Sequence, residues 1–327
     1  MKKTILRCLL LGFVIALTCQ WAMAVDNVVF AGSYKDPDTS IISKYYQKSP
    51  TDAFTRAEGE ELANSIFAYT GSTFTLDEEE SNDEILLYRN TDEKTGICYI
   101  ELATGKVFFN KGMEDYLIAG ETPGLPDDAA APQIAKNHLQ ALNLYPSTGV
   151  VLHHVGGLGM AIHEEDGTNS NYKKLVFVYE NRELDDLTVV GSSRVVTGLG
   201  TDNELVSLGR CWVDVSPVNA APTEILPGTA TRERITTQLL EAYPNAEYIE
   251  VQNQQLVYYD DGKGIIEPAL LISGIVIPQG ETDSQSIDWI VSIMVTPHAI
   301  YPYDNITPPQ PADPPDNPDD IPTGEDE

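Results

Sequence analysis

Histidine and acidic residues gather in one segment of the chain, HHVGGLGMAIHEED, and could hold a metal ion. His153, His163, Glu164 and Asp166 supply nitrogen and oxygen donors of the kind that Zn²⁺ binds. The His-Glu-x-x-His pattern is absent, because no second histidine follows His163 at that spacing. His153 and His154 are adjacent, and on a strand they would face opposite sides. We therefore expect surface histidines beside a loop, and a metal-dependent hydrolase centred on His163 is an alternative function.

Acidic residues recur in short clusters that could collect Ca²⁺. The clusters lie at residues 77–80, 164–171 and 260–261. None follows the D-x-[DN]-x-[DN]-G spacing of an EF-hand loop, and a calcium site needs several oxygens that converge on one point. Asp260 and Asp261, in QLVYYDDGKGIIEPALLISGIVIP, are expected to form a tight turn between two strands. Solvated turns are the expected role of all three clusters, and a Ca²⁺-tuned surface or structural protein is a further alternative.

The sequence lacks common signatures of catalysis and cofactor binding. No G-x-S-x-G nucleophile elbow occurs. The GGLG run at residues 156–159 is not a phosphate loop, because it lacks the lysine of G-x-x-x-x-G-K-[ST]. We expect no catalytic residue, no cofactor and no enzyme activity.

The chain begins with a segment typical of a secretory signal. Three basic residues precede an apolar run, Cys8–Thr18, and the small-x-small sequence Ala-Met-Ala ends at residue 24. An apolar run of this length is too short to span a bilayer comfortably. We expect residues 1–24 to be removed and the protein to be periplasmic, secreted or otherwise extracytoplasmic, without membrane insertion after cleavage.

Two of the four cysteines, Cys98 and Cys211, lie beyond the predicted signal peptide. Both fall in strand-like runs of a chain that we expect to reach an oxidising compartment. A single disulfide between them is the simplest prediction. Two buried free thiols are the alternative.

Negative charge dominates the composition. The chain has 50 Asp and Glu against 20 Lys and Arg, a net charge of -30, and loss of the three basic residues of the signal leaves -33. Such a field repels nucleic acid and anionic membranes, and neither is an expected partner. We expect the partner to be another secreted or envelope protein.

The C-terminal segment, residues 304–327, has a composition that cannot form a core. DNITPPQPADPPDNPDDIPTGEDE contains seven prolines and eight acids and no Lys or Arg. Repeated proline favours an extended, polyproline-like conformation. We expect a disordered spacer or solubilising tail.

Helical periodicity appears in three segments, and strand-like runs follow each of them. The first, residues 55–69, opens with a Thr55-x-x-Glu58 capping box. The second and third cover residues 127–144 and 229–243. The expected buried stripes are Ala63, Ile66 and Phe67; Ala131, Ile134, Ala135, His138 and Leu142; and Ile235, Leu239 and Ala242.

The later two helices end alike, which indicates a repeat. LNLYP at residues 142–146 matches LEAYP at residues 240–244, and downstream KLVFVYENRELDDLTVVGSSRVV parallels QLVYYDDGKGIIEPALLISGIVI. The two tyrosines are 98 residues apart, whereas the matched Leu175 and Leu256 are 81 apart. The earlier copy then carries 17 extra residues, and the segment 156–172 is the expected insertion and the expected loop for partner contact.

An alanine-rich helix, a proline turn and a strand set of the form R-x-L-D-x-L-x-V-x-G resemble PepSY-type modules over residues 128–296. Such modules occur in propeptides of secreted metallopeptidases and in extracytoplasmic accessory proteins. The resemblance implies a helix-plus-sheet fold and a regulatory or binding role. This chain departs from the pattern at Asp186, where we expect a turn glycine. The residues that match are Arg182, Leu184, Asp185, Leu187, Val189, Gly191, Asp202 to Glu204 and Trp212.

Together these patterns predict an α+β fold of tandem helix-plus-antiparallel-sheet modules, PepSY/cystatin-like, with a disordered acidic and proline-rich tail. The predicted function is non-enzymatic binding or regulation of another exported protein, such as inhibition of a peptidase or an accessory role. The predicted divisions are a signal peptide at 1–24, a divergent α+β module at 25–126, a PepSY-like module at 127–222 with the insertion 156–172, a second at 223–303, and the tail at 304–327.

Overall fold

A computed structural model of the 327-residue chain describes residues 28–49, 53–91, 95–112, 114–116, 118, 120–163 and 169–299. The predicted signal peptide and the predicted tail lie outside the described residues. None of the helices within the described ranges has the length and apolar character needed to cross a membrane.

The described part of the chain contains three α-helices and four short 3₁₀ helices. The α-helices are α2 (Arg56–Thr70), α3 (Ala131–Ala141) and α4 (Gly228–Ala242). The 3₁₀ helices are η1 (Thr39–Ile41), η2 (Glu114–Tyr116), η3 (Thr201–Asn203) and η4 (Pro222–Glu224).

Strands make up most of the regular structure. The strands are β1 (Val28–Phe30), β2 (Lys44–Lys48), β3 (Phe74–Leu76), β4 (Ile85–Asn90), β5 (Ile97–Glu101), β6 (Lys106–Asn110), β7 (Val150–His163), β8 (Asn169–Leu184), β9 (Leu187–Gly191), β10 (Arg194–Leu199), β11 (Leu205–Cys211), β12 (Val215–Asn219), β13 (Ala246–Asp260), β14 (Ile265–Pro278) and β15 (Gln285–Ser292). These 15 strands are connected by hydrogen bonds in the order β12-β2-β14-β13-β9-β8-β10-β11-β6-β5-β4-β3, with β1 beside β13, β15 beside β14 and β7 beside β8.

The predicted fold of tandem helix-plus-sheet modules is wrong. The described residues form one large mixed sheet, and 46% of those residues are strand and 20% helix. Strands from distant parts of the chain pair with one another. Strand β6 pairs with β11, and β2 pairs with both β12 and β14. Two pairings, β1 with β13 and β9 with β13, are parallel. The strands of each predicted module therefore form hydrogen bonds with strands of another predicted module, and no module closes into a separate sheet.

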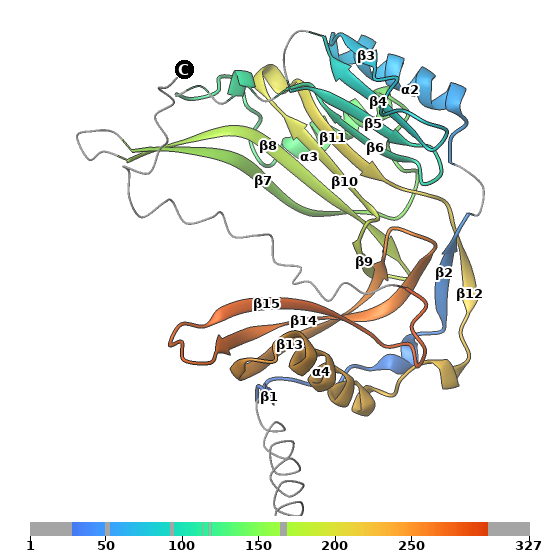
Figure 1. Cartoon of the computed structure of the whole chain (residues 1–327), viewed down its shortest axis with the longest axis vertical. Helices are drawn as coiled ribbons and strands as arrows, with labels where there is room; N and C mark the ends of the chain where they lie inside the picture. The colour runs from blue at the N-terminus through green and yellow to red at the C-terminus, as the bar shows by residue number, and fades with distance from the viewer. Residues whose placement is uncertain are drawn as a thin grey trace, which may run out of the picture.

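Figure 1 shows the strands divided between two lobes. The large lobe, drawn at the top, contains β3 to β8, β10 and β11 with helices α2 and α3. The small lobe, drawn below it, contains β1, β2 and β12 to β15 with α4. Strand β9 connects the lobes, since it pairs antiparallel with β8 after a tight turn and parallel with β13.

The three helices begin near the predicted residues and bury most of the predicted apolar positions. In α2 the Thr55–Glu58 capping box is present, and Ala63, Ile66 and Phe67 are buried as predicted. Helix α3 buries Ala131, Ala135 and Leu139, and α4 buries Thr231, Ile235 and Leu239. Helices α2 and α3 share one core in the large lobe, and α4 packs on Ile249, Val251 and Trp289 in the small lobe.

The predicted alignment of the two repeats is wrong. Leu175 lies in β8, the second strand after α3, whereas Leu256 lies in β13, the first strand after α4. Residues 180–182, matched to the Asp260–Asp261 turn, lie inside β8, and the chain turns later, at Asp185 and Asp186, which have positive φ of 49° and 62°. The proposed insertion 156–172 is instead a continuation of the β7–β8 hairpin, although its tip, 164–168, is outside the described residues.

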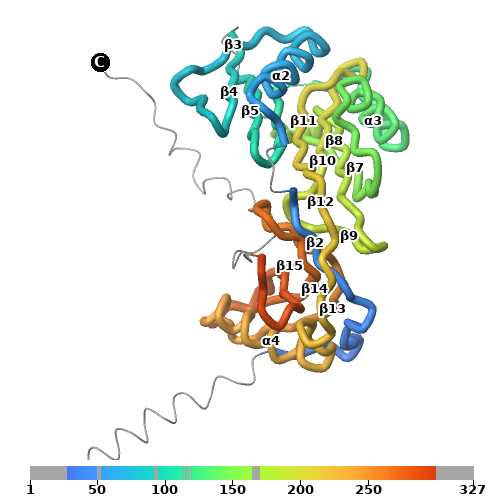
Figure 2. The backbone as a smooth tube through the Cα atoms, turned by 90° about the vertical axis from the view of Figure 1, so that its right-hand side faces the viewer, coloured from blue at the N-terminus to red at the C-terminus, as the bar shows by residue number. Residues whose placement is uncertain are grey.

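One face of the large-lobe sheet is covered by helices and the other is not. Side chains alternate between the faces of a strand, and Val107 and Phe109 of β6 lie in the core with α2 while Phe108 points away and is 40% exposed. In Figure 2, α3 lies on one side of β8, β10 and β11, and β3 to β5 curl toward the opposite side. The uncovered face is therefore concave.

The capping box of α2 gives a direct test of the described helix start. Thr55→Ala removes the side-chain oxygen that accepts from the Glu58 backbone N–H, and we expect it to lower the free energy of unfolding by about 1 kcal/mol. Thr55→Ser keeps the hydroxyl and is the matched control, expected to stay within a few tenths of the parent. Urea denaturation followed by circular dichroism measures both, and equal losses in the two variants would contradict the cap.

Candidate binding groove

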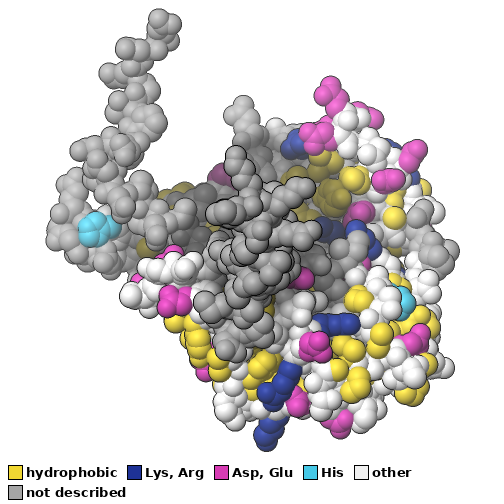
Figure 3. Space-filling model, turned by 60° about the horizontal axis from the view of Figure 1, so that its bottom comes forward, with side chains coloured by type: hydrophobic (Ala, Val, Ile, Leu, Met, Phe, Trp, Pro, Cys, Tyr) yellow, Lys and Arg dark blue, Asp and Glu magenta, His cyan; other side chains and the backbone are white. Residues whose placement is uncertain are grey.

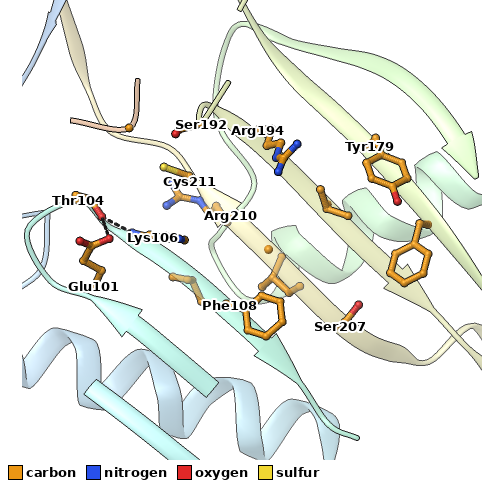
Figure 4. Close-up of a pocket in the computed structure, with 16 residues that line it drawn as sticks. Glu101, Thr104, Lys106, Phe108, Tyr179, Ser192, Arg194, Ser207, Arg210 and Cys211 are labelled. Carbon is orange, nitrogen blue, oxygen red and sulfur yellow. Dashed lines mark hydrogen bonds between the residues drawn. The ribbon is translucent and has the colours of Figure 1, made fainter. Parts of the chain in front are cut away.

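A groove of about 480 Å³ crosses the uncovered face of the large lobe, over β6, β11, β10 and β8. Figure 4 shows the side chains that line it. At the end nearest the small lobe it is bordered by Ser192 and Gly262, which belong to the connections after β9 and β13. The residues that line it are Glu101, Thr104, Lys106, Val107, Phe108, Phe177, Tyr179, Ser192, Arg194, Val196, Ser207, Leu208, Gly209, Arg210, Cys211 and Gly262.

Strand register places the groove side chains in rows that run across the sheet. Residues that pair across neighbouring strands share a face. The middle row contains aromatic side chains at both sides and small residues between them, in the order Tyr99, Phe108, Gly209, Val196, Tyr179 and His154.

Glycine and other small residues form the floor of the groove. A Cβ on Gly198 would lie 2.2 Å from Ser207 Oγ and 2.8 Å from Phe177 Cε1, and no side chain fits there. A Cβ on Gly209 would meet nothing closer than Val196, at 3.9 Å, because the space above it is open. The two strands between the aromatic sides, β11 and β10, therefore form the bottom of a trough. Its width from the backbone of β6 to that of β8 is three inter-strand distances, or about 14 Å.

Aromatic rings form the two walls. Phe108 stands on the β6 side and is 40% exposed. On the β8 side, Phe177 and Tyr179 have ring centroids 6.2 Å apart, and Tyr179 stacks on His154 of β7 with centroids 4.2 Å apart. Burial lowers the pKa of His154, and the neighbouring His153 lowers it further. At neutral pH the β8 wall is therefore an uncharged aromatic surface.

Two cations, Lys106 and Arg194, lie near the small-lobe end of the groove. Arg194 pairs in register with Cys211, and the next position of β6 beyond the Arg210–Val107 pair is Lys106. Both cations are exposed, and neither forms an ion pair with any residue in the described ranges. Lys106 lies over the Tyr99 ring, 5.9 Å from its centroid. The acid nearby, Glu101, accepts a hydrogen bond from Thr104 Oγ1 at 2.8 Å.

A buried ion pair closes the small-lobe end. Lys48 Nζ lies 2.7 Å from Asp260 Oδ1, and Ser193 Oγ donates to Asp260 Oδ2 at 2.5 Å. Asp260 is 1% exposed and ends β13. The expectation that both paired acids are solvated turn residues is therefore wrong for Asp260, whereas Asp261 follows the strand and accepts from the Lys263 backbone N–H as a turn residue does.

Most of the residues that carried the PepSY resemblance lie around this junction rather than in the groove, whereas Asp202 to Glu204 lie in the connection between β10 and β11, at the other end of these strands. The Arg182 guanidinium lies 4.4 Å from the Trp212 ring centroid and donates to Val213 O, and burial lowers its pKa to about 10. Asp185 accepts hydrogen bonds from Lys44 and Tyr46 of β2. Asp186 has a positive φ, which explains why a turn glycine was expected there. These residues join the lobes.

Of the four predicted metal-binding residues, the two that the structure describes, His153 and His163, lie far apart. His153 and His163 lie ten positions apart in β7, about 33 Å along an extended strand. Glu164 and Asp166 lie outside the described residues. His153 and His154 contact each other with ring centroids 4.8 Å apart, because a bulge in β7 interrupts the alternation expected for neighbours. Within the described ranges, no three His, Cys, Asp or Glu side chains form a group that could hold a metal ion.

The predicted disulfide is absent, and Cys98 and Cys211 are free thiols. Cys98 lies in β5 and points into the helix-covered core, whereas Cys211 ends β11 and lines the groove on the opposite face. Strand β6 lies between them, and a disulfide cannot bridge that separation. Burial raises the pKa of the Cys98 thiol to about 12 and also raises that of Cys211. Both remain protonated at neutral pH and are poor nucleophiles.

Sequence reasoning did not find the groove. Its residues come from five strands, and only the register brings them together. A usable signal was present in Gly198 and Gly209, since an isolated glycine inside a strand marks a bulge or a close approach.

Comparison with known proteins gives remote structural likeness only. No protein family and no curated protein matches the sequence. An uncharacterized protein from Eubacterium rectale ATCC 33656 is similar in structure with a TM-score of 0.46 and 12% identity, over 78% of this chain and 84% of that one. The C-terminal domain of Bacillus megaterium YpeB is similar with a TM-score of 0.35 and 10% identity, over 73% of this chain and 95% of that one. Likeness at this level assigns no function.

The buried ion pair predicts unequal roles for two adjacent acids. Asp260→Asn leaves Lys48 charged and buried without its partner, and we expect a loss of about 3–5 kcal/mol in the free energy of unfolding. Asp261→Asn is the matched control and should cost less than about 1 kcal/mol, since asparagine keeps the turn hydrogen bond. Chemical denaturation of both variants measures the difference, and similar losses would show that Asp260 is not buried with Lys48.

Free thiols predict a specific alkylation pattern. In the chain that begins near Val25, iodoacetamide under denaturing, non-reducing conditions should add two groups, at Cys98 and Cys211. In the folded chain Cys98 should react far more slowly, because it is fully buried. Mass spectrometry of both samples measures this, and no adduct in the denatured, unreduced chain would establish a disulfide.

Proposed function

We propose that the chain is an exported, non-enzymatic binding protein whose groove holds an extended, carboxylate-bearing segment of another exported protein. One observation carries the proposal: partly exposed aromatic rings and two cations without an ion pair in the described ranges share one concave face of a strongly acidic chain.

Cations are scarce in this chain. Acids outnumber Lys and Arg by 50 to 20, and several of the basic side chains lie within 3 Å of a carboxylate, as Lys44 does with Asp185 and Lys173 with Asp128. In the space-filling view, Lys and Arg are fewer than Asp and Glu on the visible surface (Figure 3). Lys106 and Arg194 form no ion pair within the described ranges, although Glu101 is the cross-strand neighbour of Lys106, and they are thus available to the carboxylate of a ligand.

The aromatic walls supply the apolar part of the contact. Exposed aromatic side chains around a recess are typical of binding surfaces. The floor of the groove extends from Cys211 to Ser207, a length of about 14 Å along β11. A bound peptide in an extended conformation would cover this length with about four residues. A helix, about 10–12 Å in diameter with its side chains, would fill the width without room for the walls.

The groove chemistry supports binding rather than turnover. The described residues that line it include no histidine. Its hydroxyl groups are on Thr104, Tyr179, Ser192 and Ser207, and that of Thr104 donates at 2.8 Å to Glu101, the one carboxylate among those residues. Burial raises the pKa of the Cys211 thiol, which makes it a poor nucleophile.

Export and partner class follow from the sequence. Residues 1–24 have the features of a secretory signal. The resemblance to PepSY-type modules makes a secreted peptidase the first partner to test.

A peptide library displayed on phage tests the proposed function. Panned on the full chain, the library should yield peptides that combine Asp or Glu with Pro or an aromatic residue. Phe108→Ala should weaken binding of each selected peptide about ten-fold, the effect of removing an aromatic contact worth about 1–2 kcal/mol. Tyr69→Ala is the matched control, because Tyr69 is 44% exposed on α2 at the helix-covered side. Equal weakening by both substitutions, or selected peptides without acids, would contradict the groove as the binding site.

A further inference from the structure

We propose that the groove is occupied in cis by the chain's own acidic, proline-rich segment, Asp304–Glu327. The inference rests on the proposed function, since it takes the groove to be a site for acidic extended segments. It adds that the chain supplies one such segment itself, and that an outside partner has to displace it.

The composition of the segment complements the groove. Its seven prolines favour an extended polyproline conformation, and such segments dock against aromatic-lined grooves without large loss of conformational entropy. Its eight acids and absence of Lys or Arg suit Lys106 and Arg194. The open space above Gly209 lets a backbone approach the sheet closely there.

The last described residue, Ala299, lies in the cluster against which Val190 of β9 packs. Glu267 of β14 is fully buried and accepts from the backbone N–H groups of His298 and Ala299, which holds the end of the described chain against β14. Ser192, at the groove end, is two residues beyond Val190, about 7 Å along a strand.

The remaining chain is long enough to enter the groove. Residues 300–327 are 28 residues, about 85 Å in a polyproline conformation. The step from Val190 to Ser192 and the length of the floor from Cys211 to Ser207 add up to about 21 Å of extended strand, which is well within that reach.

Electrostatic attraction at the groove outweighs the general repulsion between an acidic tail and an acidic body. At physiological salt, charges farther than about 8 Å are screened. A carboxylate over Cys211 would have Lys106 on one side and Arg194 on the other, one strand spacing away in each direction. Glu101 is held by Thr104 and lies beyond Lys106, at the outer rim.

Tethering converts weak binding into high occupancy. A flexible link gives an effective concentration of about 1 mM, and a segment whose free peptide binds with a Kd of about 100 µM would then raise the apparent Kd of a competitor about ten-fold. The tail would thereby set a threshold of affinity that a partner must exceed.

The experiment compares the full chain with a full-length variant in which the six Asp of the segment become Asn and the two Glu become Gln. The probe is a fluorescent synthetic peptide with the sequence of residues 304–327, followed by anisotropy. The probe should bind the neutral-tail variant about ten-fold more tightly than the parent. Adding Lys106→Glu and Arg194→Glu to the neutral-tail variant should abolish binding, whereas Lys35→Glu with Arg56→Glu, the same charge change away from the groove, should leave it unchanged. Alkylation of Cys211 should also be slower in the parent than in the neutral-tail variant.

Each outcome decides the matter. Equal affinity of the probe for parent and neutral-tail chains would overturn occupancy in cis while leaving the groove a binding site. No binding to either chain would overturn the inference, and the library peptides, tested on the neutral-tail chain, would show whether the proposed function fails with it. Growth of the parent into larger species with concentration, measured by light scattering, would place the tail in a second copy and also overturn occupancy in cis.

Discussion

The buried carboxylate of Asp260, held by Lys48 and by Ser193, is the group on which the contact between the two lobes depends. It joins β2 to the end of β13, and Ser193 connects the same carboxylate to the start of β10. A charge this deeply buried is tolerated only with its partner in place. Lys48 holds this carboxylate within the small lobe, and the Ser193 hydrogen bond connects it to the large lobe. The same carboxylate accepts from the Gly262 backbone N–H, and it therefore helps to position Ser192 and Gly262 at the end of the groove.

Strand alternation then separates the two faces of the large lobe. Every second side chain enters the core beneath α2 and α3, and the intervening ones form the groove. A one-residue shift in the register of β6 would exchange Phe108 for Phe109 and move Lys106 into the core, a costly change. The same register that buries Val107 and Phe109 thus presents the aromatic and basic residues on the open side, and fold and site have one cause.

Local features could be predicted from the sequence, and long-range ones could not. The capping box at Thr55 and the buried stripe of α2 depend on neighbours within a few residues, and both are present. The sheet depends on pairings such as β6 with β11, about 100 residues apart, which no periodicity reveals. The predicted alignment of the two repeats was wrong for the same reason. The sequences around Leu175 and Leu256 are similar, but Leu175 lies in the second strand after α3 and Leu256 in the first strand after α4. The groove, built from register alone, was beyond local reasoning.

The most direct test of the groove as the binding site is a nuclear magnetic resonance titration of the chain, labelled in its Phe and Tyr rings, with an acidic proline-rich peptide. The chain should carry the neutral tail to keep the groove open. The account predicts shifts in the ring signals of Phe108, Phe177 and Tyr179, with no change at Phe67 or Phe74, which stack together on the helix-covered side. Shifts confined to other rings, or none at saturating peptide, would contradict it.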